Sequence, residues 1–374
     1  SSDLADVKHP DAVQAACTGL AGASKLCAVR MRCTKKSLSA PAPEASARQG
    51  RGARAERPSF DLFGPLPLKG LFQGCAQLLV LVLLGPADGL LPLELVADAF
   101  GGVRPLRELV VTRCLALSQD MFKLQASCPR LQRLELPFSS IGGGLDMRLP
   151  LAKLKRLRSL DLRAAPRHPW LSPEMFATVE KVTSLAQLYF SNQTFLCDRR
   201  FFLLNKHSGR LLALHLDGCG SMVGDRVFSL LHRCRRLESL RLPRLVAEHS
   251  EGSETSQQSS SRWCRGLKCP ALRDFRVDAW DSLEDSGVLL LASQNPRLRS
   301  VALRHVPLLS DDAVCYVAAL AWLVELTVSH SALTNRALRE LSAAPRLQAL
   351  ELSACRAISD VGVREFVAGL AAAG

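Results

Sequence analysis

The stretch Leu211-Leu212-Ala213-Leu214-His215-Leu216-Asp217-Gly218-Cys219 contains the phrase L-x-x-L-x-L, which returns along most of the chain. The other clear copies begin at Leu157, Leu237 and Leu347. Looser copies, with Val, Phe or Met at some later positions, begin at Leu26, Leu78, Leu106, Leu131, Leu185, Leu272, Leu298 and Leu323. From Leu78 onward successive copies start 24 to 28 residues apart, except for one interval of 35 before Leu272. The chain therefore consists of about twelve similar units.

Each unit begins with a short extended segment whose alternate residues point the same way. A core such as Leu240-Arg241-Leu242 is too short to bury its apolar face alone, so stacked copies must share one continuous core. This period and phrase predict a leucine-rich-repeat solenoid. The expected fold class is an α/β horseshoe of about twelve repeats of roughly 26 residues, with a parallel sheet on the concave side and helices on the convex side.

Helical patterns follow the extended segments. Ser310-Asp311-Asp312, Leu333-Thr334-Asn335 and Ile358-Ser359-Asp360 each precede an apolar run with helical spacing. A Ser, Thr, Asn or Asp in that place predicts a helix N-cap. A doubly wound α/β fold would also alternate strands and helices, but the short, even period and the lack of long Val/Ile strands favour the solenoid.

Two segments interrupt the repeats. Residues 34–70 are rich in Pro, Ala and Arg and predict a disordered basic insertion, and residues 247–262 predict a polar loop. The expected organisation is an N-terminal repeat or cap at 1–33, the insertion, and one leucine-rich-repeat domain at 71–374. No run of about eighteen apolar residues predicts a membrane span. Because Ser1 is not Met, we expect a processed product or a fragment.

Six of the thirteen cysteines occupy fixed positions of the repeat. Cys114, Cys219 and Cys355 each lie eight residues after a repeat's first Leu, and Cys128, Cys234 and Cys269 lie shortly before the next one. We expect small buried core residues in a reducing compartment, not a disulfide framework. Two zinc alternatives, the pair His215 and Cys219 and the group of His249, Cys264 and Cys269, have spacings that the repeat explains equally well.

The formal net charge of +13 admits a nucleic-acid partner. The basic residues are spread over loops and predicted helix faces, and few aromatic residues lie beside them. This distribution favours a solvated basic surface. RNA, anionic lipid and an acidic protein remain the alternatives.

The predicted concave face carries the candidate binding residues. Residues two, four and six after each first Leu should point away from the core. In the middle repeats they include Tyr and Arg, the residue types that anchor protein interfaces. The candidate partner-contacting residues are Arg163, Tyr189, His215, Asp217, Arg241 and Arg276. In the second and third repeats the same column is apolar, with Val80, Val82, Leu84 and Val110, which predicts a cover. The cover could be the insertion, an N-terminal segment or a partner, and we favour the insertion, through Phe60, Leu62 and Phe63.

The phrases Leu211-x-x-Leu214-x-Leu216-x-x-Cys219 and Leu347-x-x-Leu350-x-Leu352-x-x-Cys355-x-x-Ile358-Ser359-Asp360 resemble the cysteine-containing leucine-rich repeat. This subtype is typical of F-box/leucine-rich-repeat proteins, which are substrate receptors of SCF ubiquitin ligases. The segment 91–100 is similar to the opening of an F-box, but the next repeat starts at Leu106, so it predicts the helix of the second repeat. An F-box that recruits Skp1 would then precede Ser1.

No phosphate loop, dinucleotide fingerprint, metal-binding helix or nucleophile elbow is present in the sequence. We therefore expect no enzyme, no cofactor and no metal. The first functional hypothesis is a non-enzymatic protein-interaction scaffold, in its finer form a substrate-recognition subunit of an SCF-type ligase in the cytoplasm or nucleus. The alternative is a structural subunit of a large ribonucleoprotein or organellar complex, in the organellar matrix after removal of a transit peptide.

Overall fold

The computed structural model describes two compact units, Ser1–Arg156 and Leu157–Gly374. The described residues are 5–7, 28–32, 68, 72–73, 75–85, 90–141, 151–163, 178–179, 181–191, 202–220, 222–246 and 264–373. The sequence predicted one repeat domain from residue 71. Because each repeat of a solenoid contacts only its neighbours, a boundary between compact units can fall between any two repeats.

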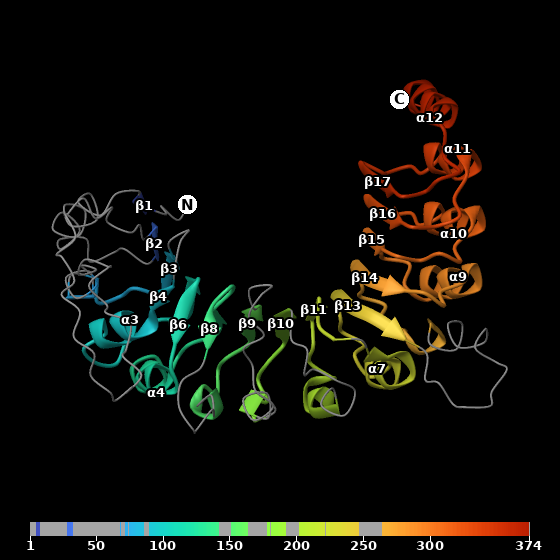
Figure 1. The fold of residues 1–374 in the computed structure, drawn as a ribbon. Helices are drawn as coiled ribbons and strands as arrows, with labels where there is room; N and C mark the ends of the chain where they lie inside the picture. The colour runs from blue at the N-terminus through green and yellow to red at the C-terminus, as the bar shows by residue number, and fades with distance from the viewer. Residues whose placement is uncertain are drawn as a thin grey trace, which may run out of the picture. The chain divides into compact units, whose positions relative to one another are not determined.

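The first unit contains a parallel sheet (Figure 1), whose strands follow one another in the order β1 (Ala5–Val7), β2 (Ala28–Arg32), β3 (Val80–Leu84), β5 (Glu108–Thr112) and β7 (Arg133–Glu135). The sequence did not predict a second, smaller parallel sheet of β4 (Leu91–Pro92), β6 (Cys114–Ala116) and β8 (Ser140–Ile141). The helices are α3 (Leu93–Ala99), α4 (Ser118–Ser127) and the 3-10 turn η2 (Leu151–Lys153). The F-box-like segment is thus the helix of a repeat, as predicted.

The second unit repeats the arrangement. Its parallel strands are, in order, β9 (Ser159–Arg163), β10 (Gln187–Ser191), β11 (Ala213–Asp217), β13 (Ser239–Val246), β14 (Asp274–Trp280), β15 (Ser300–Leu303), β16 (Glu325–Ser329) and β17 (Ala349–Ser353), and β12 (Met222–Val223) pairs with β13. The helices are η3 (Phe202–His207), α7 (Gly224–Leu231), α9 (Asp285–Gln294), α10 (Asp311–Ala318), α11 (Asn335–Ser342) and α12 (Asp360–Ala373).

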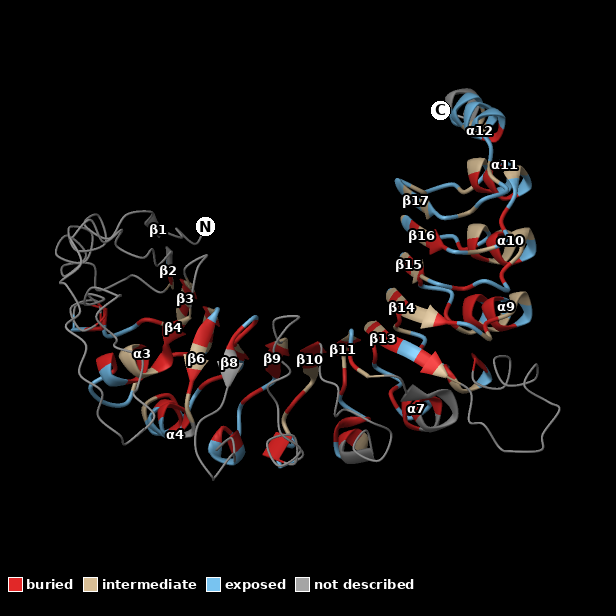
Figure 2. Cartoon of the chain, in the orientation of Figure 1, coloured by how far each residue is buried: buried red, intermediate tan, exposed pale blue. Residues whose placement is uncertain are grey.

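The leucines of the repeat phrase form the core, as Figure 2 shows for the inner strands. Leu160, Leu188, Leu214 and Leu240 lie opposite one another on adjacent strands and are fully buried. The residues between them on each strand are mostly half-buried and point to the other face. The α/β leucine-rich-repeat solenoid and the alternation along its strands are therefore confirmed.

The turn that follows each strand has a recurring backbone conformation. The seventh residue after the first Leu has a positive φ in six repeats, at Arg113, Phe138, Gly218, His305, His330 and Ala354. In β13 and β14 the residues at that position, Arg244 and Ala279, are instead extended and pair with each other. These two strands are consequently the longest, and Trp280 at the end of β14 is fully buried, with its ring 5.5 Å from that of Phe228.

The predicted N-caps link neighbouring repeats. The Ser310 hydroxyl accepts a hydrogen bond from the backbone N–H of Asp312 and donates to the Asp285 carboxylate of the preceding repeat, at 2.5 Å. Thr334 caps α11 in the same way and donates to Asp311 at 2.6 Å. A single hydroxyl therefore satisfies one helix end and one carboxylate of the neighbouring turn.

Several repeats have a buried cysteine or asparagine three residues before their first Leu. Cys128, Cys234 and Cys269 are fully buried, and the Cys269 thiol lies 3.3 Å from the Cys234 carbonyl oxygen. The residue at this position in the next repeat is Asn295, which is also fully buried. The prediction of buried cysteines is wrong for Cys355, which is half-buried, because it follows β17 at one end of the described sheet.

Several predictions concern the insertions. Leu68, near the end of the predicted insertion, is helical and fully buried. Val80, Val82, Leu84 and Val110 are half-buried, whereas Phe60, Leu62 and Phe63, predicted to cover them, lie outside the described residues, as does the loop at 247–262. None of the helices in the described part of the chain is long and apolar enough to cross a membrane.

Candidate functional site

The six candidate residues lie on the sheet face that points away from the helices of the second unit (Figure 1). The in-register strands place Asp161, Tyr189, His215, Arg241 and Arg276 side by side on five consecutive strands. We call the surface formed by these side chains and their contacts the polar strip: Asp161, Arg163, Tyr189, His215, Asp217, Ser239, Arg241, Asp274, Arg276 and Asp278. The register is what gathers residues that are more than a hundred positions apart in sequence.

One end of the polar strip is a guanidinium–carboxylate pair. The Arg163 Nη2 lies 2.7 Å from Asp161 Oδ2, and its Nε lies 3.0 Å from Oδ1. The Asp161 side chain is only 2% exposed, whereas that of Arg163 is 39% exposed. The buried carboxylate therefore orients an arginine that still presents part of its surface to a partner.

A chain of side-chain contacts crosses the middle of the polar strip. The Tyr189 ring meets the His215 ring edge to face, with centroids 4.7 Å apart. His215 Nε2 lies 2.6 Å from the Ser239 hydroxyl, which donates to Asp274 Oδ2 at 2.7 Å. Since that hydroxyl gives its proton to the carboxylate, it accepts from His215, which places the imidazole proton on Nε2. Arg241 also approaches Asp274, at 3.4 Å.

The electrostatics of the polar strip keep His215 neutral. Burial, together with the positive charges of Arg241, Arg163 and Arg276, lowers its pKa to about 4, although Asp274 acts in the opposite direction. The imidazole is therefore uncharged near pH 7, where it donates a hydrogen bond without carrying a charge. A partner would meet a fixed neutral donor here.

The far end of the polar strip contains a carboxylate with a missing donor. Arg276 Nε lies 3.3 Å from Asp278 but 4.0 Å from Asp217 Oδ1, which is beyond hydrogen-bond distance. Asp217 Oδ1 is itself buried and has no hydrogen-bond partner in the described part of the chain. Burial raises the pKa of this carboxyl group, although Arg241 and Arg276 oppose the shift. The Asp217 side chain as a whole is 26% exposed, so an incoming donor can still approach its carboxylate group.

The order of these groups does not match a nucleophilic triad. In such a triad a histidine stands between the nucleophilic hydroxyl and the carboxylate, so that it can take the hydroxyl proton. Here Ser239 stands between His215 and Asp274 and donates to the carboxylate directly. The arrangement orients side chains for contact, and it gives Ser239 no histidine base.

The cysteines considered as zinc ligands are buried thiols. Burial raises the pKa of Cys264 and of Cys269 to about 12, so neither is a thiolate near neutral pH. His249 lies outside the described residues, and His215 Nε2 lies 2.6 Å from the Ser239 hydroxyl. Within the described ranges, no group of three or more His, Cys, Asp or Glu side chains is placed to hold a metal ion.

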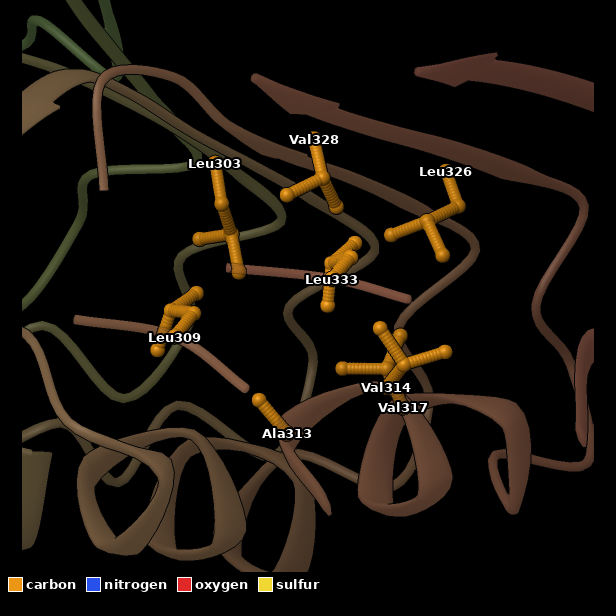
Figure 3. A pocket seen from close by; sticks show the side chains of 8 residues that line it. All are labelled: Leu303, Leu309, Ala313, Val314, Val317, Leu326, Val328 and Leu333. Atoms are coloured by element: carbon orange, nitrogen blue, oxygen red, sulfur yellow. The ribbon is translucent and has the colours of Figure 1, made fainter. Parts of the chain in front are cut away.

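A small cavity lies in the core between α10 and strands β15 and β16. Its wall is entirely aliphatic, and Figure 3 shows the side chains, including Leu303, Val314, Leu326 and Leu333, pointing toward one another. Its volume of about 10 Å³ is about that of one water-sized probe. It is a gap in packing between two repeats and is too small for an organic ligand.

The sequence predicted the six candidate residues but not the contacts that connect them. Ser239 and Asp274, each two residues after a first Leu, belong to the predicted concave face but not to the six candidate residues. Their importance comes from the pairing of β11, β13 and β14, which no local pattern reveals. Asp161 was passed over for the same reason.

The stacked parallel strands with their buried leucines define a leucine-rich-repeat solenoid fold. The chain is similar to a chain in the crystal structure of the yeast Rad7 and Elc1 complex, with a TM-score of 0.54, 15% identity, and coverage of 78% of this chain and 74% of that chain. It is also similar to the internalin InlF of Listeria monocytogenes, with a TM-score of 0.40, 14% identity, and coverage of 75% and 81%. No protein-family model and no curated protein sequence matches it. At these identities the likeness concerns the fold alone.

Proposed function

We propose that the chain is a non-enzymatic protein-interaction scaffold that holds a protein partner on the polar strip. The observation that carries this proposal is the partly exposed network around His215 and Arg241, with the buried Asp217 Oδ1 beside it left without a donor. Tyr and Arg side chains in such surroundings are the usual anchors of protein interfaces. The partner is expected to bring a Lys, an Arg or another donor to Asp217.

The test is quantitative affinity capture with the double variant Tyr189→Ala/Arg241→Ala. The matched control, Leu289→Ala/Arg339→Ala, removes one large exposed side chain and one arginine from helices α9 and α11. We expect the same partner to be captured by the wild type and the control and to be lost with the strip variant. Equal capture by all three proteins would refute a role for the polar strip.

A finer form of this proposal is a substrate-recognition subunit of an SCF-type ubiquitin ligase in the cytoplasm or nucleus. Its support is the resemblance of the cysteine-containing repeats and the nine described cysteines, all free thiols, as suits a reducing compartment. Co-purification of Skp1 and a cullin with the protein expressed at its natural level is the expected result. If the protein captures its partner on the polar strip but neither Skp1 nor a cullin, the scaffold proposal stands and the ligase proposal is refuted.

A further inference from the structure

The basic residues of the second unit are not spread evenly over its surface. Most lie in the segments through which the chain leaves a helix and enters the next strand. We call this surface the strand-entry edge. Its basic residues, all exposed, are Arg158, Lys181, Lys206, Arg210, Arg233, Arg235, Arg236, Arg265, Lys268, Arg273, Arg297, Arg299 and Arg346. Within the described part of these segments the one acidic residue is Glu238, which lies 3.9 Å from Arg273.

The sheet arranges these segments in one line. Because the strands are parallel and in register, every strand is entered at the same edge. Backbone hydrogen bonds connect neighbouring segments directly, with Arg273 N to Glu238 O at 2.8 Å and Arg299 N to Arg273 O at 2.7 Å. Adjacent parallel strands lie about 4.8 Å apart. The basic side chains therefore form a cationic ribbon along this edge, with a gap at the segment that enters β16, whereas in the sequence they look scattered.

The opposite edge, where the chain leaves each strand, has a different character. Its acidic residues are used internally: Asp285 accepts a hydrogen bond from Ser310, and Asp281 and Asp312 pair with arginines at 2.5 and 3.2 Å. Positive and negative charges are mixed there. The excess positive charge of the unit is thus concentrated on the strand-entry edge.

An exposed aromatic side chain lies on the same edge. Trp322 is 44% exposed, and the guanidinium of Arg346 lies 4.2 Å and that of Arg299 5.7 Å from its ring centroid. A cationic track combined with an exposed aromatic ring is the arrangement by which proteins bind single-stranded nucleic acids. Ten of the thirteen basic residues are arginines, which match phosphate oxygens in a fork geometry.

We propose that the strand-entry edge of residues 158–346 binds the phosphate backbone of a single-stranded nucleic acid, independently of its sequence. A surface of one sign of charge suits a polymer with a uniform charge of the opposite sign. A specific acidic protein would instead be met by a mixed pattern of charges, which sets the register of an interface. This surface is distinct from the polar strip, so a protein partner and a nucleic acid could be held together.

The test is fluorescence anisotropy of the full chain with labelled 20-nucleotide oligo(U) RNA and oligo(dT) DNA over a series of salt concentrations. The edge variant is Arg235→Gln/Arg236→Gln/Arg273→Gln/Arg297→Gln. Its matched control, Arg244→Gln/Arg304→Gln/Arg336→Gln/Arg356→Gln, removes the same charge from the strand-exit side. A third variant, Trp322→Leu, leaves every charge in place.

For single strands the slope of log K against log salt is about −0.7 for each phosphate neutralised. We expect the edge variant to lose up to about 2.8 from the magnitude of this slope, while the control keeps the wild-type slope. Trp322→Leu should weaken binding about tenfold with the slope unchanged. Tighter binding of the RNA than of the DNA of the same length would identify RNA as the ligand, and the reverse order would identify DNA.

Three results would overturn the proposal. The first is equal weakening by the edge and control variants, which would mean that net charge alone attracts the probe. The second is binding of a labelled 20-residue poly-glutamate as tightly as the nucleic acids, which would indicate an acidic protein partner. The third is the absence of saturable wild-type binding near physiological salt. Circular dichroism of each variant reports that it is folded.

Discussion

Asn295 offers the sharpest test of how the repeats are held together. Its side chain is fully buried at the C-terminal end of α9. The Nδ2 group donates to the carbonyl oxygens of Leu267 and Leu291 at 2.9 and 2.8 Å, and Oδ1 accepts from the Cys269 N–H at 3.0 Å. Two of these three hydrogen bonds, those with Cys269 and Leu267, reach the preceding repeat. The Asn295 side chain therefore connects the backbones of two neighbouring repeats.

The variant Asn295→Leu keeps the number of heavy atoms and the branched shape of the side chain, and it removes its hydrogen bonds. The Cys269 N–H and the Leu267 carbonyl would then be buried without partners, since both residues are fully buried. Each such group costs about 1–3 kcal/mol, so we expect a loss of about 4 kcal/mol. For a unit of about 200 residues this corresponds to a fall in Tm of about 8–16 °C.

Two measurements check this loss, thermal unfolding by circular dichroism and hydrogen exchange of the peptide that contains Cys269. A local loss of about 3 kcal/mol would speed exchange of that amide more than about 100-fold. The control is Ser293→Ala, an exposed serine of the same helix that bonds only within it. Asn295→Cys should be intermediate, because a thiol at the equivalent position, in Cys269, reaches a carbonyl of the preceding repeat. An unchanged Tm and unchanged exchange in Asn295→Leu would refute the reasoning.

Three further predictions follow from single side chains. Because burial lowers the pKa of His215 in the folded protein to about 4 from an ordinary 6.5, its contribution to stability is present above about pH 6.5 and is lost as the pH falls toward 4. When the pH is lowered from 7 to 4.5, the free energy of unfolding in urea should therefore fall less for His215→Gln than for the wild type. Equal losses in the two proteins would contradict this. Burial raises the pKa of Cys234 to about 12, so iodoacetamide at pH 8 should label the half-buried Cys355 well before Cys234 in the native chain. Peptide mass spectrometry measures the two labelling rates, and equal rates would contradict the prediction. Ala354 has a φ of +53°, so Ala354→Gly should raise the free energy of unfolding by about 0.5 kcal/mol. The control Ala349→Gly, in strand β17, should lower it by a similar amount. A lower free energy of unfolding in both variants would show that the turn is not strained.

Local patterns in the sequence were sufficient for the elements that depend on near neighbours. The spacing of Leu237, Leu240 and Leu242 predicts a short strand with a buried face, and that face is buried. Ser310 and Thr334 predict helix starts, and each caps its helix. These features require only a residue's own backbone and the next few positions, so one copy of the repeat contains the information.

Features that depend on the neighbouring repeat could not be predicted in this way. The link from His215 through Ser239 to Asp274 joins three strands that are separated by different numbers of residues in the sequence. The exposure of Cys355 depends on its place at the end of the described sheet, although its sequence context matches that of the buried Cys219. Position in the stack, rather than the local phrase, decides such cases.

The sequence by itself determined the architecture of this protein, because a period of roughly 26 residues admits only stacked strand-and-helix units. It also determined which face of each strand enters the core. Only the tertiary structure decided how the surface is divided. Parallel, in-register strands place every entering segment on one edge, and so they gather Arg273, Arg297 and Arg299 into one cationic ribbon and separate it from the polar strip.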